Sequence, residues 1–229
     1  MLTLTSSDEG RAMMQLIHDI APGAKLLFYT AFESPVDFAQ GIITLADNGA
    51  DIIVDDISWL KMPMFQDGPI AQAVNEVKAR GVSYFSAAGN AARFSYAQNF
   101  ERGQTEARDF AHDFGRAAGG ESDFYQRIII PKGSTFRVIL QWDDQAEIAN
   151  SIEGAKTDLD LFLLDADHRR IITSSQDSNI GHDPVEFIGL SFEDSNSEST
   201  EFNLKISHHA GPAPTNLKYV VIASSPPWA

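Results

Sequence analysis

Asn90 stands at the end of a run of small residues, Ala87-Ala88-Gly89, which follows an apolar β-type stretch at 82–85. Small residues let a ligand or another backbone approach closely, and a side-chain amide in such a place can donate a hydrogen bond into a cleft. In acyl transfer this is the task of an oxyanion-hole donor. The same pattern is also typical of a buried strand that ends in a Gly-Asn turn, so the flanking elements must decide.

Glu9 is the second residue that could take part in catalysis, because it follows Asp8 at the start of a stretch with helical periodicity. A carboxylate can serve as a general base when burial or a second carboxylate tunes its pKa. Two acids at a helix start also favour the helix N-terminus electrostatically. Both interpretations of Glu9, as a base and as a helix cap, stay open at this point.

Several acids of the second half could supply oxygen ligands to calcium, which binds carboxylates and carbonyls. Alternate acids on a strand share one face, and acids are also typical of strand ends and turns. Calcium is therefore a candidate cofactor, with turn chemistry as the alternative. The candidate ligands are Asp143, Asp144, Asp158, Asp160 and Glu186. The pair His208-His209 is predicted to be an exposed turn rather than a metal site.

The composition limits the class of protein. The chain has 229 residues, 43% of them hydrophobic, and a net charge of −15, which indicates a globular protein. Phosphate binding needs a basic face, so we expect no nucleic-acid partner. There is no cysteine, which excludes disulfides and thiolate metal sites. No apolar run approaches the ~20 residues of a membrane span, so we expect no membrane partner, and the N-terminal residues do not form a signal peptide.

Helical and strand patterns alternate over the first ninety residues. Apolar residues at helical spacing predict three helices, and apolar runs predict three buried strands. The helices are expected near 9–20, 35–48 and 68–80, and the strands near 25–30, 51–57 and 82–85. This order predicts a parallel sheet with crossover helices, whose chemistry lies at the carboxyl ends of its strands.

With these elements in place, the segment from Glu9 to Asn90 resembles the middle of a subtilisin-like serine peptidase (a subtilase). The matching motifs are Glu9-Gly10-Arg11, Ala21-Pro22-Gly23-Ala24, the strand at 50–58, and Ala87-Ala88-Gly89-Asn90. The resemblance implies that Asn90 is the oxyanion donor and that Glu9 occupies the position of the family's histidine. It also implies a substrate-binding set: Asp56, Ile57, Ser58, Ala88 and Gly89.

The chain departs from the subtilase pattern at the catalytic residues. Neither the family's Asp motif before Glu9 nor its Gly-Thr-Ser motif after Asn90 is present. Loss of a triad member costs many orders of magnitude in rate, so we expect this chain alone to have no peptidase activity. The main hypothesis is a part of a serine endopeptidase. The alternatives are a catalytically dead scaffold that binds peptide, protein or glycan through a β-sandwich, and a sedolisin-like acid peptidase that uses Glu9.

The second half has the pattern of an all-β sandwich. Short apolar stretches separated by turn residues predict about seven strands from residue 125 onward. This half resembles the jelly-roll modules attached to secreted peptidases, through Trp142-Asp143-Asp144 and Asp158-Leu159-Asp160-Leu161. We predict an α/β parallel-sheet domain of the partial subtilisin type at 1–92, a linker at 93–124 and a jelly-roll-like β-sandwich at 125–229.

The resemblance also carries expectations about partners and location. It implies a peptide or protein substrate in the parent enzyme and a secreted or periplasmic protein. A subtilase sheet without its first and last strands would have exposed edges, and exposed edges favour association. We therefore predict a homo-oligomer formed through the sheet edges.

Overall fold

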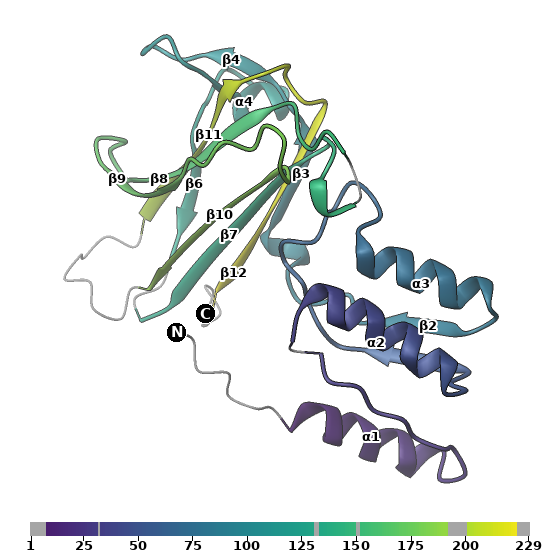
Figure 1. Cartoon of the computed structure of the whole chain (residues 1–229). Coiled ribbons are helices and arrows are strands. Elements are labelled where there is room, and N and C mark those ends of the chain that lie inside the picture. The colour runs from purple at the N-terminus through teal and green to yellow at the C-terminus, as the bar shows by residue number, and fades with distance from the viewer. Residues whose placement is uncertain (1–7, 32, 131–132, 150–151, 192–200, 224–229) are drawn as a thin grey trace. The chain divides into compact units, whose positions relative to one another are not determined.

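The computed structural model describes residues 8–31, 33–130, 133–149, 152–191 and 201–223. The chain divides into two compact units. The first comprises Met1–Ile57 and Pro69–Ala87, and the second comprises Ser58–Gly68 and Ala88–Ala229 (Figure 1). None of the described helices is both long and apolar enough to cross a membrane.

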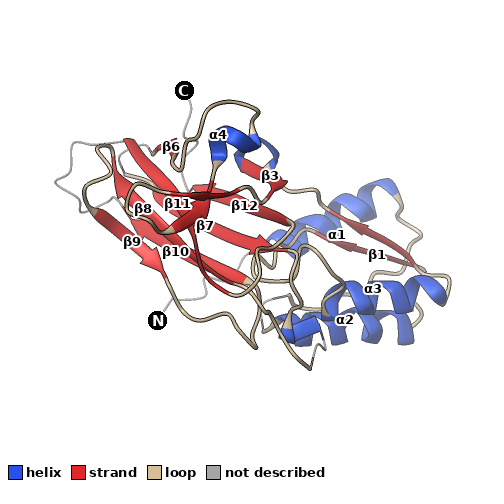
Figure 2. Cartoon of the chain, turned by 90° about the horizontal axis from the view of Figure 1, so that it is seen from above, coloured by secondary structure: helices blue, strands red, loops and turns tan. Residues whose placement is uncertain are grey.

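The first unit has three helices and a two-stranded parallel sheet. The helices are α1 (Glu9–Ile20), α2 (Pro35–Asp47) and α3 (Pro69–Ala79), and the strands are β1 (Ile52–Asp55) and β2 (Ser83–Ser86). Ser34 caps α2 by accepting the backbone N–H of Asp37 at 3.0 Å, as its position before Pro35 predicts. In Figure 2 the two strands appear in red beside the blue helices of the same unit. The predicted helices, and two of the three predicted strands, are confirmed.

The prediction of a buried strand at 25–30 is wrong. This segment joins no described strand, and Leu27 and Phe28 are 48% and 62% exposed. Its neighbouring rings contact two different helices, because Phe28 lies against Gly10 of α1 and Tyr29 lies against Gly41 of α2. The apolar run has the composition of a strand, but a strand also needs a partner, which local sequence does not supply.

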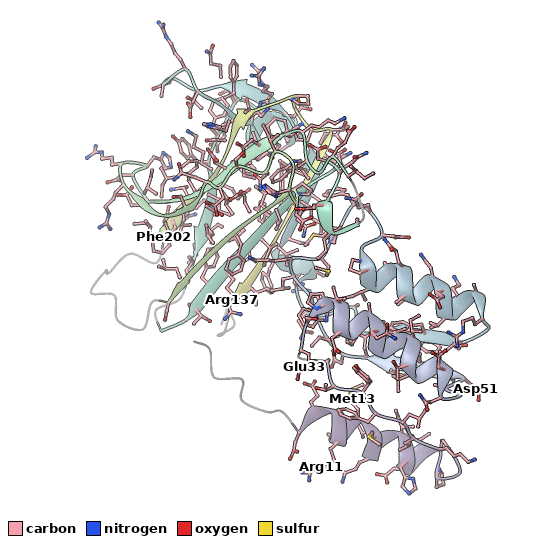
Figure 3. The ribbon with its side chains drawn as sticks, in the orientation of Figure 1. Arg11, Met13, Glu33, Asp51, Arg137 and Phe202 are labelled. Carbon is pink, nitrogen blue, oxygen red and sulfur yellow. The ribbon has the colours of Figure 1, made fainter. Side chains whose placement is uncertain are left out.

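The second unit is an antiparallel β-sandwich, as predicted. One sheet has the order β10-β7-β12-β3, and the other has the order β4-β5-β11-β8-β9, with β6 also paired to β11. The first sheet consists of β3 (Ser95–Asn99), β7 (Thr135–Trp142), β10 (Val185–Ser191) and β12 (Asn216–Ala223). The second consists of β4 (Arg102–Gln104), β5 (Phe110–His112), β6 (Gln126–Ile129), β8 (Asp158–Asp165), β9 (Ile171–Ser175) and β11 (Glu201–Ala210). Figure 3 labels a residue on each sheet, Arg137 on β7 and Phe202 on β11.

Alternating side chains of the two sheets form the core between them. From β8, Leu159, Leu161 and Leu163 enter the core and are fully buried. Trp142 of β7 meets them from the facing sheet, and Leu204 of β11, the strand beside β8, enters the same core. Since side chains alternate along a strand, the even-numbered residues of β8 point to the opposite, outer face of the second sheet.

The predicted linker at 93–124 is wrong, because these residues belong to the sandwich. They contain β3, β4, β5 and the short helix α4 (Phe114–Ala117). Phe100 and Phe114 lie in the core. The strands are difficult to recognise in the sequence, because they are short and only one face of each strand is apolar.

The outer face of the first sheet is covered by the segment Ser58–Gly68. The buried side chain of Gln141 accepts the backbone N–H of Met64 at 2.9 Å and donates to the carbonyl of Met62 at 2.9 Å. The ammonium of Lys61 lies 5.1 Å from the ring centroid of Phe187 on β10. The predicted sandwich domain, 125–229, thus lacks both this cover and the first three sandwich strands.

Candidate ligand-binding groove on the β-sandwich

The outer face of the second sheet carries a groove of about 380 Å³. Its floor is formed by Asp160 and Phe162 of β8 and by the residues opposite them on β11, Ser207 and Lys205. They share this face because the intervening leucines of β8 point into the core. Around this floor the groove is lined by Asp109, Phe110, Leu164, Ile171, His208 and His209.

The acidic side chains of the groove each lie beside a basic side chain of the groove. The ammonium of Lys205 donates to the carboxylate of Asp109, which also accepts the hydroxyl of Thr105. Nδ1 of His209 lies 3.7 Å from Oδ2 of Asp160. The ammonium of Lys205 favours the charged form of Asp109. The groove therefore offers hydrogen-bonding groups without a large excess of charge.

The two carboxylates of the groove have their pKa values shifted in opposite directions. Burial acts to raise the pKa of Asp109, but the hydrogen bonds from Lys205 and Thr105 outweigh burial and lower it. Burial raises the pKa of Asp160, and nearby Asp158 adds to the increase, while His209 opposes it. Asp109 thus stays a firm acceptor, whereas Asp160 is the more easily protonated of the two.

Apolar surface completes the groove. Phe110 is 36% exposed, and the guanidinium of Arg102 lies 3.6 Å from its ring centroid. A cation over the ring fixes its orientation and covers one of its faces. Ile171 of β9 is 53% exposed. Apolar groups with a few convergent polar groups are typical of small-ligand sites.

The residues predicted from the subtilase resemblance do not line this groove. Asn90 is exposed and follows Ala88 and Gly89 at the beginning of the second unit. Glu9 is the exposed first residue of α1 in the first unit. The predicted roles of Asn90 and Glu9, and the substrate roles of Ala88 and Gly89, stay predictions.

The carboxyl ends of β1 and β2 meet at Asp55, which sequence analysis did not single out. Asp55 accepts the hydroxyls of Tyr84 and Ser86, the latter at 2.8 Å. Burial and the bond to Asp55 raise the pKa of Tyr84 far above its usual value. Of the predicted substrate residues next to it, Asp56 and Ser58 are exposed and Ile57 is half-buried. Parallel pairing brings Asp55 and Ser86 into register, and only the sheet reveals this.

Two of the predicted calcium ligands are occupied by loop donors. Asp143 accepts the backbone N–H of Thr215 and the amide of Asn216, both at 2.9 Å. Asp144 accepts the backbone N–H groups of Lys156 and Thr157, both at 2.7 Å. These contacts match the turn alternative given for the two acids.

The other predicted calcium ligands, Asp158, Asp160 and Glu186, are near enough for Asp158 to raise the pKa of Asp160 and for Asp160 to raise that of Glu186. Glu186 is 1% exposed, and burial raises its pKa to about 7. One of its oxygens has no hydrogen-bond partner among the described residues, and the same holds for Oδ1 of Asn179. Asp158 accepts the backbone N–H of Asn179 at 3.2 Å. Over the described residues, no group of three or more His, Cys, Asp or Glu side chains has a metal-binding arrangement. Calcium stays a prediction.

The prediction of an exposed turn at His208 and His209 is wrong about the turn, since both residues lie on β11 and line the groove, and it is wrong about exposure only for His208. His208 is 8% exposed, and its Nε2 contacts the carbonyl of Gly211 at 3.1 Å, where it donates. Burial lowers the pKa of His208. The alternation of β8 already placed Asp158 and Asp160 on one face, but nothing in the sequence identified β11 as the neighbouring strand.

No model of a protein family matches this chain, and no curated protein matches its sequence. One similar solved structure is titled "CBM4 structure and function", with 10% identity and a TM-score of 0.30. The match covers 58% of this chain and 80% of that chain. A TM-score this low carries no argument, so the class of the second unit, an antiparallel β-sandwich, rests on its own strands.

Proposed function

We propose that this chain is a binding module that holds a neutral glycan in the groove on the outer face of the β-sandwich. The observation that carries the proposal is the floor formed by β8 and β11, where Asp160 and Ser207 stand next to Phe162. A sugar ring presents hydroxyls at its rim and C–H groups on its faces. Carboxylates and a hydroxyl suit the first, and phenylalanine rings suit the second.

The groove favours a glycan over a peptide for a geometric reason. Peptides bound in extended form gain affinity from backbone hydrogen bonds to a sheet edge. This groove lies on a sheet face, where side chains rather than backbone groups are offered. A ligand that binds through its own hydroxyls and C–H groups fits such a face better.

The charge balance favours a neutral glycan over an acidic one. Asp109 is paired with Lys205, and Asp160 lies beside His209. An anionic sugar would have to compete with Asp109 for Lys205 while lying close to Asp160. Repulsion from these carboxylates would then oppose its binding.

The test is calorimetric titration of the chain with neutral gluco-, xylo- and manno-oligosaccharides. We expect binding that Phe110→Ala weakens at least tenfold, about 1.4 kcal/mol. Phe65→Ala is the matched control, because Phe65 is 38% exposed and Phe110 is 36% exposed, and Phe65 does not line the groove. Absence of binding to every neutral oligosaccharide, or equal affinity of Phe110→Ala and the unchanged chain, contradicts the proposal.

The subtilase resemblance leads to a different function, a serine endopeptidase. No comparison supports it, and this chain lacks the nucleophile and the acid that such a peptidase uses. A role in a peptidase stays a prediction about a longer protein. The binding proposal for the sandwich does not depend on it.

A further inference from the structure

Among the described residues, one face of the sheet in the first unit is bare and apolar. On the other face, Ile53 is 5% exposed and Val77 of α3 is fully buried. On the bare face, Ile52, Val54 and Phe85 are 62%, 46% and 59% exposed, and Val54 and Phe85 are directly opposite in the ladder. Exposed apolar side chains on a strand can be partly buried against cross-strand neighbours, so this exposure favours a further strand beside β1.

The outer edge of β1 has unused backbone groups at the same residues. The carbonyls of Asp51 and Asp55 accept the N–H groups of Ser83 and Ala87, at 2.9 and 3.2 Å. Backbone groups alternate in direction along a strand, so those of Ile52 and Val54 point away from β2. Within the described part of the chain, β2 is the only strand paired with β1.

We propose that a second copy of this chain pairs with the outer edge of β1, so that two copies form a four-stranded sheet with the order β2-β1-β1-β2. Two strands of four residues each are marginal by themselves, and a sheet of four strands is more stable. In an antiparallel pair related by a two-fold axis, Ile52 of one copy stands opposite Val54 of the other. Both residues are uncharged, and their outward backbone groups then bond to each other, so this edge is self-complementary.

The same arrangement sets the salt dependence of the dimer. With Ile52 opposite Val54, Asp51 of each copy stands opposite Asp55 of the other. Like charges directly opposite are destabilising, and salt screens them. We therefore expect added sodium chloride to strengthen the association, whereas a dimer held by ion pairs would be weakened.

Light scattering of the purified chain tests this pairing, with Val54→Lys as the disrupting variant. We expect a mass of twice 25.1 kDa at high protein concentration and in salt, and a return to 25.1 kDa in Val54→Lys. A lysine on an edge is a common barrier to strand pairing, and Val54 is exposed enough to accept one in the monomer. Ile180→Lys in the second unit is the matched control, with 49% exposure against 46%, and should stay dimeric.

Three outcomes overturn the proposal: a monomer at all concentrations, a mass above the dimer, or equal behaviour of the two lysine variants. Hydrogen exchange gives a second measurement on the unchanged chain. The amides of Ile52 and Val54 should become protected as concentration rises, and unchanged exchange there contradicts pairing through β1. Circular dichroism of Val54→Lys verifies that the variant is folded.

Discussion

The side-chain amide of Gln141 on β7 is hydrogen-bonded to the backbone N–H of Met64, 77 residues earlier in the chain. Its other end donates to the carbonyls of Met62 and Leu60, at 2.9 and 3.4 Å. Gln141 is 2% exposed, so these bonds are shielded from water. One glutamine therefore fastens the segment Ser58–Gly68 across the outer face of the first sheet.

This fastening predicts a large loss of stability in Gln141→Leu. Leucine fills a similar volume but leaves backbone groups of the half-buried residues Met62 and Met64 without their partner on Gln141, at about 1–3 kcal/mol each. We expect a loss of about 2–4 kcal/mol in the free energy of unfolding, measured in urea by tryptophan fluorescence. Gln98→Leu makes the same change at an exposed site of β3 and should cost little. Equal stability of the two variants would show that the fastening is unimportant.

The raised pKa of Glu186 predicts that this residue makes the protein less stable as pH rises. Its pKa is about 7 in the fold and near 4.5 when exposed, so between these values the folded state holds a proton that the unfolded state releases. The contribution of Glu186 to stability is therefore greatest below pH 4.5, declines toward pH 7 and is constant above. Glu186→Gln should remove this decline and gain up to about 3 kcal/mol at pH 8, relative to the unchanged chain. A stability difference between the two proteins that does not vary from pH 5 to 8 contradicts the shifted pKa.

The environment of His112 predicts the opposite effect at acid pH, an increase of stability with rising pH. The backbone N–H of Glu101 donates to its Nδ1, so Nε2 carries the proton and contacts the hydroxyl of Tyr96 at 2.8 Å. Burial lowers the pKa of His112 to about 4. The unfolded chain takes up a proton below pH 6.5 and the folded chain does not, so stability is lost as pH falls from 6.5 toward 4.

Between pH 4.5 and 6.5, Glu186 makes stability fall with rising pH and His112 makes it rise. The test of His112 therefore uses the variant Glu186→Gln as its starting protein. There we expect stability to rise with pH over this interval, and the added change His112→Gln to flatten the rise. His168→Gln, at an exposed site, should leave the rise unchanged. If His112→Gln leaves the slope intact, His112 is protonated in the fold.

The predicted calcium ion has a direct test by thermal unfolding. Asp143 and Asp144 are occupied by loop donors, so an ion would need the oxygens of Glu186 and Asn179 that have no hydrogen-bond partner among the described residues. We expect millimolar calcium to raise the unfolding temperature, EDTA to lower it, and Glu186→Gln to abolish both effects. Asp143→Asn is the comparison and should keep the response. An unfolding temperature that is the same in calcium and in EDTA removes calcium as a cofactor.

The sequence by itself determined the local elements. Helical spacing predicted α1, α2 and α3, and apolar stretches bounded by turn residues predicted the sandwich strands from β6 to β12. Alternation in β8 placed Asp158 and Asp160 on one face before any partner was known. These features follow from neighbours along the chain, which periodicity records directly.

Only the tertiary structure decided which strands are neighbours. The groove depends on β11 lying beside β8, which sets Ser207 opposite Asp160, and on Asp109 reaching Lys205 from 96 residues away. The segment at 25–30 has the composition of a strand but no described partner, and residues 93–124 look polar yet complete the sandwich. Pairing and burial depend on contacts between distant segments, and local periodicity contains no record of them.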